Sequence, residues 1–356
     1  MDKIGLYIAA FIMAFSISLI CTPIAKKIAI KFGAVAYPRN RDTHKVPIPR
    51  LGGIAIVLGF TITLIFILLD PDMNFLEDKH TIGILIGGLI ISILGILDDI
   101  YEIKSSIKLL VQILAATVAV YFGIRIQFVS VPFNDLLNLE WLSIPVTIFW
   151  IVGITNAVNL IDGLDGLAAG VSSIASMCLM ILSIHSGHPT AVILTVILSA
   201  SCLGFLPYNF SPASIFMGDT GSTFLGYMLS LISILGLLKS YTIGTVCVAI
   251  LVLGLPIFDT SFAIIRRILS GRPIMSPDRG HLHHRLMDKG YSQKQAVVTL
   301  YGVSGIFGLS AMGVMLSDIR FVLAVFMIMG ILFYYNNKMH TIPNHTRKKP
   351  KETINR

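Results

Sequence analysis

Long apolar runs recur from one end of this chain to the other, and they restrict its possible folds more than any other feature. Each run has the length of about 17–25 residues that an α-helix needs to cross a bilayer. Because a backbone in lipid must satisfy its own hydrogen bonds, each run is expected to be a helix. We find eleven such runs, at residues 4–24, 51–69, 81–97, 107–123, 142–158, 167–185, 189–207, 222–238, 242–264, 296–315 and 320–335.

No polar stretch between these runs is long enough to bury a core of its own. We therefore predict an all-α polytopic integral membrane protein with about eleven transmembrane helices. They would form a single transmembrane domain at 1–335, followed by a basic tail at 336–356. Composition agrees, since 55% of the 356 residues are hydrophobic and only 13% are charged, whereas a soluble domain carries about 25% charged residues.

Two features argue against simpler interpretations of the apolar runs and the cysteines. The run at 4–24 has no small-x-small cleavage site, so we interpret it as a retained span, with a cleaved signal peptide as the alternative. The four cysteines stand singly in apolar runs without CxxC spacing, which argues against a zinc site or a disulfide framework.

The basic residues set the orientation of the chain in the membrane. If the N-terminus lies outside, all but five of the 27 Lys and Arg residues fall on the cytoplasmic side. The positive-inside rule therefore predicts an external N-terminus and a cytoplasmic C-terminus. The net charge of +8 is then a topological signal, and it does not indicate nucleic-acid binding.

The polar, Gly-rich motifs all fall in loops that this orientation places in the cytoplasm. The orientation was derived without these motifs, so their agreement independently supports one site on the cytoplasmic face. The loops are 25–50, 98–106, 159–166, 208–221 and 265–295.

Two motifs place carboxylates and amides at the inner ends of spans. Asp98 and Asp99 are adjacent at the membrane edge, where they are either a hydrated helix end or a pair that handles magnesium or phosphate. The second motif places polar groups three residues apart on one side of a helix, which favours a ligand over simple helix packing. It reads Asn156-x-x-Asn159-x-x-Asp162-Gly163-x-Asp165-Gly166.

A third motif, Gly218-Asp219-Thr220-Gly221-Ser222, opens the run at 222–238. Asp219 at a helix start is commonly an N-cap, but Gly and hydroxyl residues there also suit a metal-bridged phosphate. Asn209, upstream, could add an amide contact, and Phe216 is more typical of a core residue than of base stacking on spacing alone.

The loop 265–295 contains a histidine cluster, His281-Leu282-His283-His284-Arg285. The three histidines could bind zinc, but no fourth soft ligand is nearby, and the flanking arginines favour an anion. Upstream, Asp259 precedes Arg266-Arg267 by about two helical turns, which fits an internal ion pair and membrane anchoring.

The chain has no Walker A, GxSxG or dinucleotide-binding fingerprint. Carboxylates, amides, histidines and arginines at a membrane edge instead suit metal-assisted phosphoryl transfer. These motifs resemble those of the polyprenyl-phosphate N-acetylhexosamine-1-phosphate transferase superfamily over nearly the whole chain. The Pro49-Arg50-Leu51-Gly52-Gly53, Asp259-Thr260 and His-x-His-His-Arg forms resemble its UDP-N-acetylglucosamine branch, and most closely its teichoic-acid linkage-unit enzymes.

The resemblance implies transfer of GlcNAc-1-phosphate from UDP-GlcNAc to undecaprenyl phosphate in a bacterial plasma membrane, with Mg²⁺ or alternatively Mn²⁺. It implies Asp219 as the main metal ligand with Asp99, and Asp98, Asp99 and Asp162 as catalytic residues. It leaves a homodimer open. Implied substrate-binding residues are Lys45, Arg50, Lys108, Asn159, Asp165, Asn209, Phe216, His281, His283, His284 and Arg285.

Two alternatives stay open on the sequence. Within the superfamily, the donor could be UDP-MurNAc-pentapeptide. From another class, the chain could be a secondary transporter, although transporters carry internal repeats and polar groups near mid-bilayer. Here no repeat is visible, and the polar groups lie at the inner ends of the runs.

Overall fold

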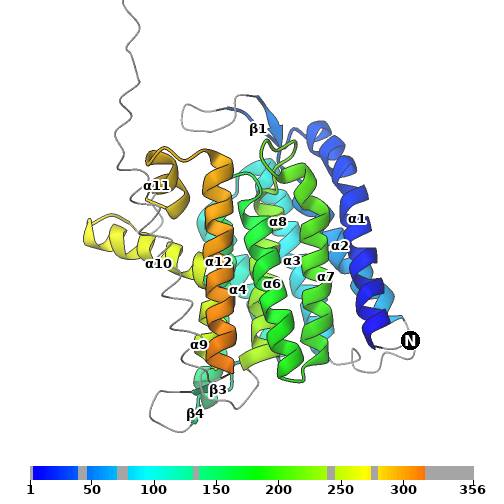
Figure 1. The fold of residues 1–356 in the computed structure, drawn as a ribbon, viewed down its shortest axis with the longest axis vertical. Helices are drawn as coiled ribbons and strands as arrows, with labels where there is room; N and C mark the ends of the chain where they lie inside the picture. Colours follow the sequence, from blue (N-terminus) through cyan, green and yellow to red (C-terminus); the bar gives the residue numbers. More distant parts are fainter. Residues whose placement is uncertain are drawn as a thin grey trace, which may run out of the picture.

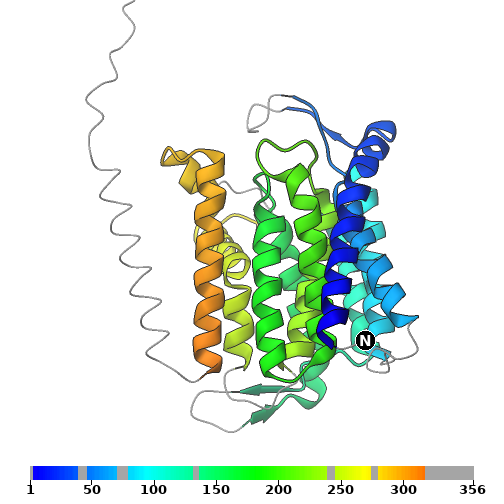
Figure 2. The same cartoon turned by 45° about the vertical axis from the view of Figure 1, so that its right-hand side comes forward.

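The computed structural model describes residues 3–38, 46–69, 79–130, 136–238, 245–273 and 280–316. Within these ranges the chain is a bundle of helices with two short antiparallel hairpins at opposite ends (Figures 1 and 2). Strands β1 (Val35–Ala36) and β2 (Ile48–Pro49) form one hairpin, in which Val35 lies opposite Pro49. Strands β3 (Phe128–Ser130) and β4 (Leu136–Asn138) form the other.

The helices follow the apolar runs closely. Seven helices in the described part of the chain are long and apolar enough to cross a membrane, and α2 and α4 are shorter apolar helices. The all-α polytopic prediction is thereby confirmed at this level. The helices are α1 (Lys3–Lys31), α2 (Gly53–Leu68), α3 (Lys79–Tyr101), α4 (Ser105–Tyr121), α5 (Ser143–Ile161), α6 (Leu167–His185), α7 (Pro189–Asn209), α8 (Gly218–Ser233), α9 (Thr245–Val252), α10 (Gly254–Leu269), α11 (Leu282–Asp288) and α12 (Gln293–Met315).

The predicted span at 242–264 is wrong as one straight helix. The chain bends by 87° between α9 and α10, and in Figure 1 α10 lies crosswise to the upright helices and projects from the side of the bundle. Pro256 explains the break, because a proline ring clashes with the carbonyl four residues earlier and offers no N–H to it. The predicted span at 320–335 and the tail at 336–356 lie outside the described residues.

Helix α8 is the axis of the bundle. Its most apolar stretch is completely buried, and it packs against α3 on one side and α5 on the other. The approach is close because glycines stand at the crossings: a Cβ on Gly226 would lie 2.7 Å from Cα of Thr155 in α5. Small residues at helix crossings permit this packing in membranes.

The ends of these helices define where a site can form. Helices α3, α5 and α7 finish, and α8 starts, at the end of the bundle opposite the N-terminus (Figures 1 and 2). The described parts of three predicted loops, 98–106, 159–166 and 208–221, therefore meet at one end. Which side of the membrane this end faces remains a prediction from the charge distribution.

Candidate active site

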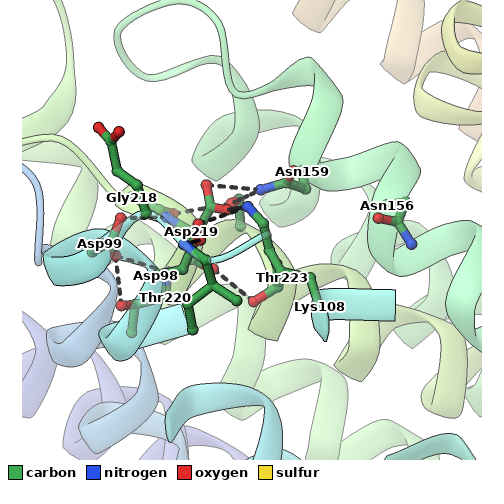
Figure 3. Close-up of polar contacts among 12 residues, drawn as sticks. Asp98, Asp99, Lys108, Asn156, Asn159, Gly218, Asp219, Thr220 and Thr223 are labelled. Carbon is green, nitrogen blue, oxygen red and sulfur yellow. Dashed lines mark hydrogen bonds and ion pairs between the residues drawn. The ribbon is translucent and has the colours of Figure 1, made fainter. Parts of the chain in front are cut away.

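A lysine joins two carboxylates where α3, α4 and α8 meet. The Nζ atom of Lys108 lies 2.7 Å from Oδ2 of Asp98 and 2.8 Å from Oδ2 of Asp219. The three side chains converge from different helices, as Figure 3 shows. The other Asp98 oxygen, Oδ1, accepts a hydrogen bond of 2.8 Å from the backbone N–H of Ile103, which fixes its orientation. This arrangement brings two acidic groups close together, and one cation offsets part of their charge.

The two adjacent aspartates differ in their surroundings. Oδ1 of Asp99 accepts a hydrogen bond from the backbone N–H of Asp219 at 2.9 Å. Its Oδ2 accepts from the backbone N–H of Thr220 at 3.0 Å and from the Thr220 hydroxyl at 2.7 Å (Figure 3). Asp99 thus contacts the start of α8, whereas Asp98 contacts Lys108.

Asn159 extends the cluster from the last turn of α5. Its Nδ2 donates to Oδ1 of Asp219 at 3.2 Å and lies 2.9 Å from the hydroxyl of Ser222. Asn156, one turn earlier, pairs instead with Gln112 of α4, whose Oε1 accepts from Asn156 Nδ2 at 2.6 Å. The predicted polar stripe therefore divides, since Asn159 faces Asp219 and Asn156 joins two helices.

The turn between α5 and α6 carries Asp162. No hydrogen bond to the Asp162 carboxylate is found among the described residues, and the nearby negative charges are those of Asp219, Asp99 and Asp165. Burial, and then repulsion from these carboxylates, raises the pKa of Asp162 to about 8. Such a carboxyl group would be stabilised by a cation or by hydrogen-bond donors that a ligand supplies.

Two predicted binding residues, Asp165 and Asn209, hold this turn in place. Oδ2 of Asp165 accepts from the backbone N–H of Ala213 at 3.0 Å. Asn209 uses both ends of its amide on the backbone, accepting from Gly166 N–H and donating to the Ile215 carbonyl, each at 3.0 Å. These bonds fasten the α5–α6 turn to the α7–α8 loop, so both residues help to shape the site.

Gly166 ends the turn with a φ of +80°, a conformation that favours glycine. Its carbonyl accepts a hydrogen bond of 2.5 Å from the hydroxyl of Tyr301 in α12. The Tyr301 ring occupies the space in which a Cβ on Gly170 would lie. Helix α12 thereby supports the turn from behind, a contact that the sequence analysis did not predict.

The segment containing Arg50 forms another wall. The backbone N–H of Phe216 donates to the Pro49 carbonyl at 2.7 Å, and the Phe216 carbonyl accepts from Gly52 N–H at 2.9 Å. Nε of Arg50 donates to the backbone carbonyl of Asp99 at 3.1 Å. Arg50 and Phe216 are therefore placed beside the aspartates through main-chain pairing, and the ring of Phe216 is partly exposed.

The histidine cluster starts α11 and has three different environments. Nδ1 of His281 lies 2.8 Å from Oδ2 of Asp259, whose Oδ1 accepts from the backbone N–H of Leu282 at 2.8 Å. Asp259 thus caps α11 and orients His281. An internal ion pair was expected for this aspartate, and the structure gives His281 as its partner. His283 is buried with its ring against Gly163 of the α5–α6 turn. Burial is the main cause that lowers the pKa of His283 to about 4.

The other two basic residues of the cluster are more open. His284 is partly exposed, with its ring centroid 4.2 Å from that of His283. Arg285 is exposed on α11. Lys45 lies outside the described residues. The structure therefore brings Asp98, Asp99, Lys108, Asn159 and Asp219 into one hydrogen-bonded cluster, and seats His283 against the turn that carries Asp162.

The donor set suits a hard divalent cation. Carboxylate oxygens are the ligands that Mg²⁺ prefers, and Asp98 and Asp219 already share one cationic partner in Lys108. In the described part of the chain, no three His, Cys, Asp or Glu side chains are close enough to form a complete metal site. Mg²⁺ usually keeps waters and binds substrate phosphates besides one or two carboxylates, so two aspartates fit it.

Several residues of the site were missed on the sequence, and some had a visible signal. Gln112 and Tyr301 are polar groups inside otherwise apolar runs, which is uncommon without a partner. Thr220 and Ser222 belong to a motif that was recognised, but a hydroxyl after an aspartate does not reveal its own hydrogen-bond partner.

The chain is similar in sequence to several known proteins. Residues 81–237 match the model of glycosyl transferase family 4. A "probable undecaprenyl-phosphate N-acetylglucosaminyl 1-phosphate transferase" from Bacillus subtilis is 45% identical over 92% of this chain and 89% of its own length. A decaprenyl-phosphate N-acetylglucosaminephosphotransferase from Mycolicibacterium smegmatis is 34% identical over 85% of this chain and 80% of its own length.

The muramyl-pentapeptide branch is more distant. A phospho-N-acetylmuramoyl-pentapeptide-transferase from Anoxybacillus flavithermus is 32% identical over 86% of this chain and 97% of its own length. Both groups of relatives are phosphoglycosyl transferases, which decides against the secondary transporter considered above. The chain belongs to the polyprenyl-phosphate N-acetylhexosamine-1-phosphate transferase superfamily, in its N-acetylglucosaminyl branch.

Proposed function

We propose that this protein transfers GlcNAc-1-phosphate from UDP-GlcNAc to undecaprenyl phosphate, giving undecaprenyl-diphosphate-GlcNAc and UMP. An oxygen of the lipid phosphate attacks the phosphorus next to the sugar. A new P–O bond forms there as the bond to the UMP phosphate breaks. With a dianionic lipid phosphate, charge and protons balance without any further reactant. The reaction would be the first membrane step of a cell-envelope polymer.

One observation carries this proposal: the Asp98–Lys108–Asp219 cluster at the bundle end, in a chain 45% identical to a relative named for this reaction. Attack of one phosphate on another is opposed by anion–anion repulsion, which rises steeply in a site of low dielectric. A catalyst of this reaction must therefore place cations beside the reacting phosphates. Carboxylates can hold and orient these cations. The cluster combines these two elements at an end of the bundle.

Lys108 is suited to bind a phosphate oxygen. Its ammonium already lies between two carboxylates, and 26% of its side chain is exposed, so an incoming anion can reach it. Asp98 is suited to orient the lipid phosphate, or to accept its proton when that phosphate arrives as the monoanion. Its fixed Oδ1, bonded to Ile103 N–H, leaves Oδ2 to face the reacting groups.

Mg²⁺ would be held by Asp219 and Asp98, and when bound it would offset the charge that develops on the donor diphosphate. Asn159 supports this role by donating to Oδ1 of Asp219, so that Oδ2 points toward Lys108. Asp162 would contribute a further carboxylate from the α5–α6 turn. Its raised pKa indicates a group that gains from a nearby cation.

The remaining groups are assigned to the donor. Arg50, Lys45, His284 and Arg285 would bind phosphates or the sugar, and the exposed part of Phe216 would lie against the uracil. His281 is oriented by Asp259 through Nδ1 and would present its other ring nitrogen to the same ligand. The positive-inside distribution supports a cytoplasmic location of the site, where UDP-sugars are present.

Turnover of a donor panel by the purified protein tests the proposal. Protein in detergent would be given undecaprenyl phosphate, MgCl₂ and one of UDP-GlcNAc, UDP-GalNAc, UDP-glucose or UDP-MurNAc-pentapeptide, and UMP would be quantified. We expect UMP release with UDP-GlcNAc at a rate at least about tenfold above the other donors, since a misplaced sugar hydroxyl leaves buried polar groups unpaired. Efficient use of UDP-MurNAc-pentapeptide without use of UDP-GlcNAc would refute it.

A further inference from the structure

We infer that Asp99 is a positioning residue, and that it acts by holding the first turn of α8, which carries Asp219, and not by binding the metal itself. The inference rests on the proposed function for the role of Asp219. It separates the functions of two adjacent aspartates that the sequence analysis assigned together. Asp98 would contact the reactants, and Asp99 would fix the helix that presents the metal ligand.

The carboxylate of Asp99 accepts hydrogen bonds from the first turn of α8. The first N–H groups of an α-helix have no partner within the helix and need an external acceptor. The carboxylate of Asp99 accepts from the N–H groups of Asp219 and Thr220 at 2.9 and 3.0 Å. A third bond of 2.7 Å comes from the Thr220 hydroxyl. An aspartate from α3 therefore caps α8, in a place where helices normally use a residue of their own chain segment.

The Asp99 carboxylate is tightly enclosed by its neighbours. Asp99 is 4% exposed, so its oxygens are enclosed by the donors that they accept from. A Cβ on Gly218 would lie 2.4 and 2.6 Å from the two Asp99 oxygens, and Gly218 has a φ of +72°. Position 218 therefore requires glycine both for its backbone conformation and for the space that Asp99 occupies.

Neighbouring contacts fix both partners of this cap. A Cβ on Gly95, one turn before Asp99, would lie 2.4 Å from Cα of Thr220, so α3 and α8 touch along their backbones. Arg50 donates to the Asp99 carbonyl at 3.1 Å and holds the end of α3. To bind a metal, Asp99 would have to give up charge-assisted bonds to two main-chain N–H groups. The Oδ2 atoms of Asp98 and Asp219, by contrast, bond the flexible side chain of Lys108, which can move aside for a metal more easily than the main chain of α8.

Hydrogen–deuterium exchange provides the direct test. In the parent protein, exchange of the Asp219 and Thr220 amides would be measured on peptides covering 217–224. Asp99→Asn removes the charge and puts an N–H₂ group near one of the two donors, so we expect those amides to exchange at least about tenfold faster, the effect of losing a charge-assisted bond. Asp98→Asn, the same change one residue earlier, is the matched control and should leave them protected.

Binding of Mn²⁺ provides the second readout and needs no turnover. Free Mn²⁺ would be counted by EPR while it is titrated into each variant. We expect Asp99→Asn to bind Mn²⁺ within about threefold of the parent and Asp219→Asn to lose binding by at least about thirtyfold, since a hard cation requires the anionic oxygen. Loss of Mn²⁺ binding in Asp99→Asn with protected amides at 219 and 220 would overturn the inference.

A second pair of variants covers the case in which Asp99→Asn does not fold. Thr220→Val keeps the shape of the side chain and removes only the hydroxyl donor, whereas Thr220→Ser keeps that donor. We expect faster exchange at 219 and 220 and lower kcat in Thr220→Val, with both restored in Thr220→Ser. Unchanged exchange in Thr220→Val would count against the cap. If the parent bound no Mn²⁺, the metal in the proposed function would fail, while the exchange measurement would still decide the role of Asp99.

Discussion

Lys108 is the one cation bonded to both Asp98 and Asp219 in the described cluster, and replacing it should have a specific effect on stability. Lys108→Gln keeps most of the side-chain length and removes the charge. The two carboxylates, which lay 2.7 and 2.8 Å from the ammonium, would then face each other uncompensated. The variant should therefore be less stable than the parent, and a divalent cation should restore what the ammonium supplied.

The magnitude follows from the burial of the three groups. Removing one partner from a fully buried pair costs about 3–5 kcal/mol, whereas an exposed pair contributes about 0–1 kcal/mol. The Lys108, Asp98 and Asp219 side chains are 26%, 10% and 29% exposed. Their partial exposure places the expected loss between these limits, at about 2 kcal/mol. At about 2–4 °C per kcal/mol, Tm should fall by about 4–8 °C.

Thermal unfolding in detergent at low ionic strength, with and without MgCl₂, is the assay. Mg²⁺ that binds only the folded state adds stability as RT ln(1 + [L]/Kd). Because the vacated position between the carboxylates is free for the metal in Lys108→Gln, its Tm should rise more with MgCl₂ than that of the parent. Lys104→Gln, an exposed lysine one turn earlier, is the matched control and should change neither quantity. A Lys108→Gln protein with parental Tm and parental Mg²⁺ response would refute the reasoning.

Three further outcomes are expected. Asp98→Asn and Asp219→Asn should purify and melt within a few degrees of the parent, yet lose at least about a hundredfold in UMP release, and near-parental turnover in either would contradict its role. His283 has a pKa of about 4, below its usual value, and is therefore neutral in the folded protein. Protonation then favours the unfolded state, so its contribution to stability should be intact above pH 6.5 and fall by about 2 kcal/mol at pH 5. Parallel Tm–pH curves for the parent and His283→Gln would disprove this. Tyr301→Phe removes the hydrogen bond to the Gly166 carbonyl and should lower the free energy of unfolding by about 1 kcal/mol. It should also lower kcat, measured by UMP release, and an unaltered kcat would show that α12 does not control the turn.

Much of the fold could be predicted because a bilayer allows few solutions. Apolar run length located the helices, and the Lys and Arg distribution placed the chemical motifs on one side before their chemistry was considered. The bend at Pro256 could have been predicted too, but hydropathy alone treats 242–264 as uniform. Proline is tolerated in the first turn of a helix but not in its interior, so Pro256 indicates a helix start near residue 254. The length of the apolar run indicated one continuous helix instead.

The candidate site was harder to predict in its details than in its location. Spacing brought Asn159, Asp162 and Asp165 to one turn, yet it could not say that Asp165 would bond the backbone of Ala213. Such roles depend on which loop lies opposite, a tertiary fact that no local pattern contains. The same holds for Asn209, whose amide is used on both sides by main-chain groups.

Helix packing deep in the bundle, far from the motifs, determines where the reacting groups lie. Asp98 and Asp219 sit on α3 and α8, so the distance between them depends on how these helices cross. Gly87 of α3 gives room to the Tyr227 hydroxyl of α8, which donates to the Ala115 carbonyl of α4 at 3.0 Å. One side chain thus joins the three helices that supply Asp98, Lys108 and Asp219. Since a misplacement of about 1 Å can cost about a hundredfold in rate, this buried tyrosine bears on the chemistry without touching a substrate.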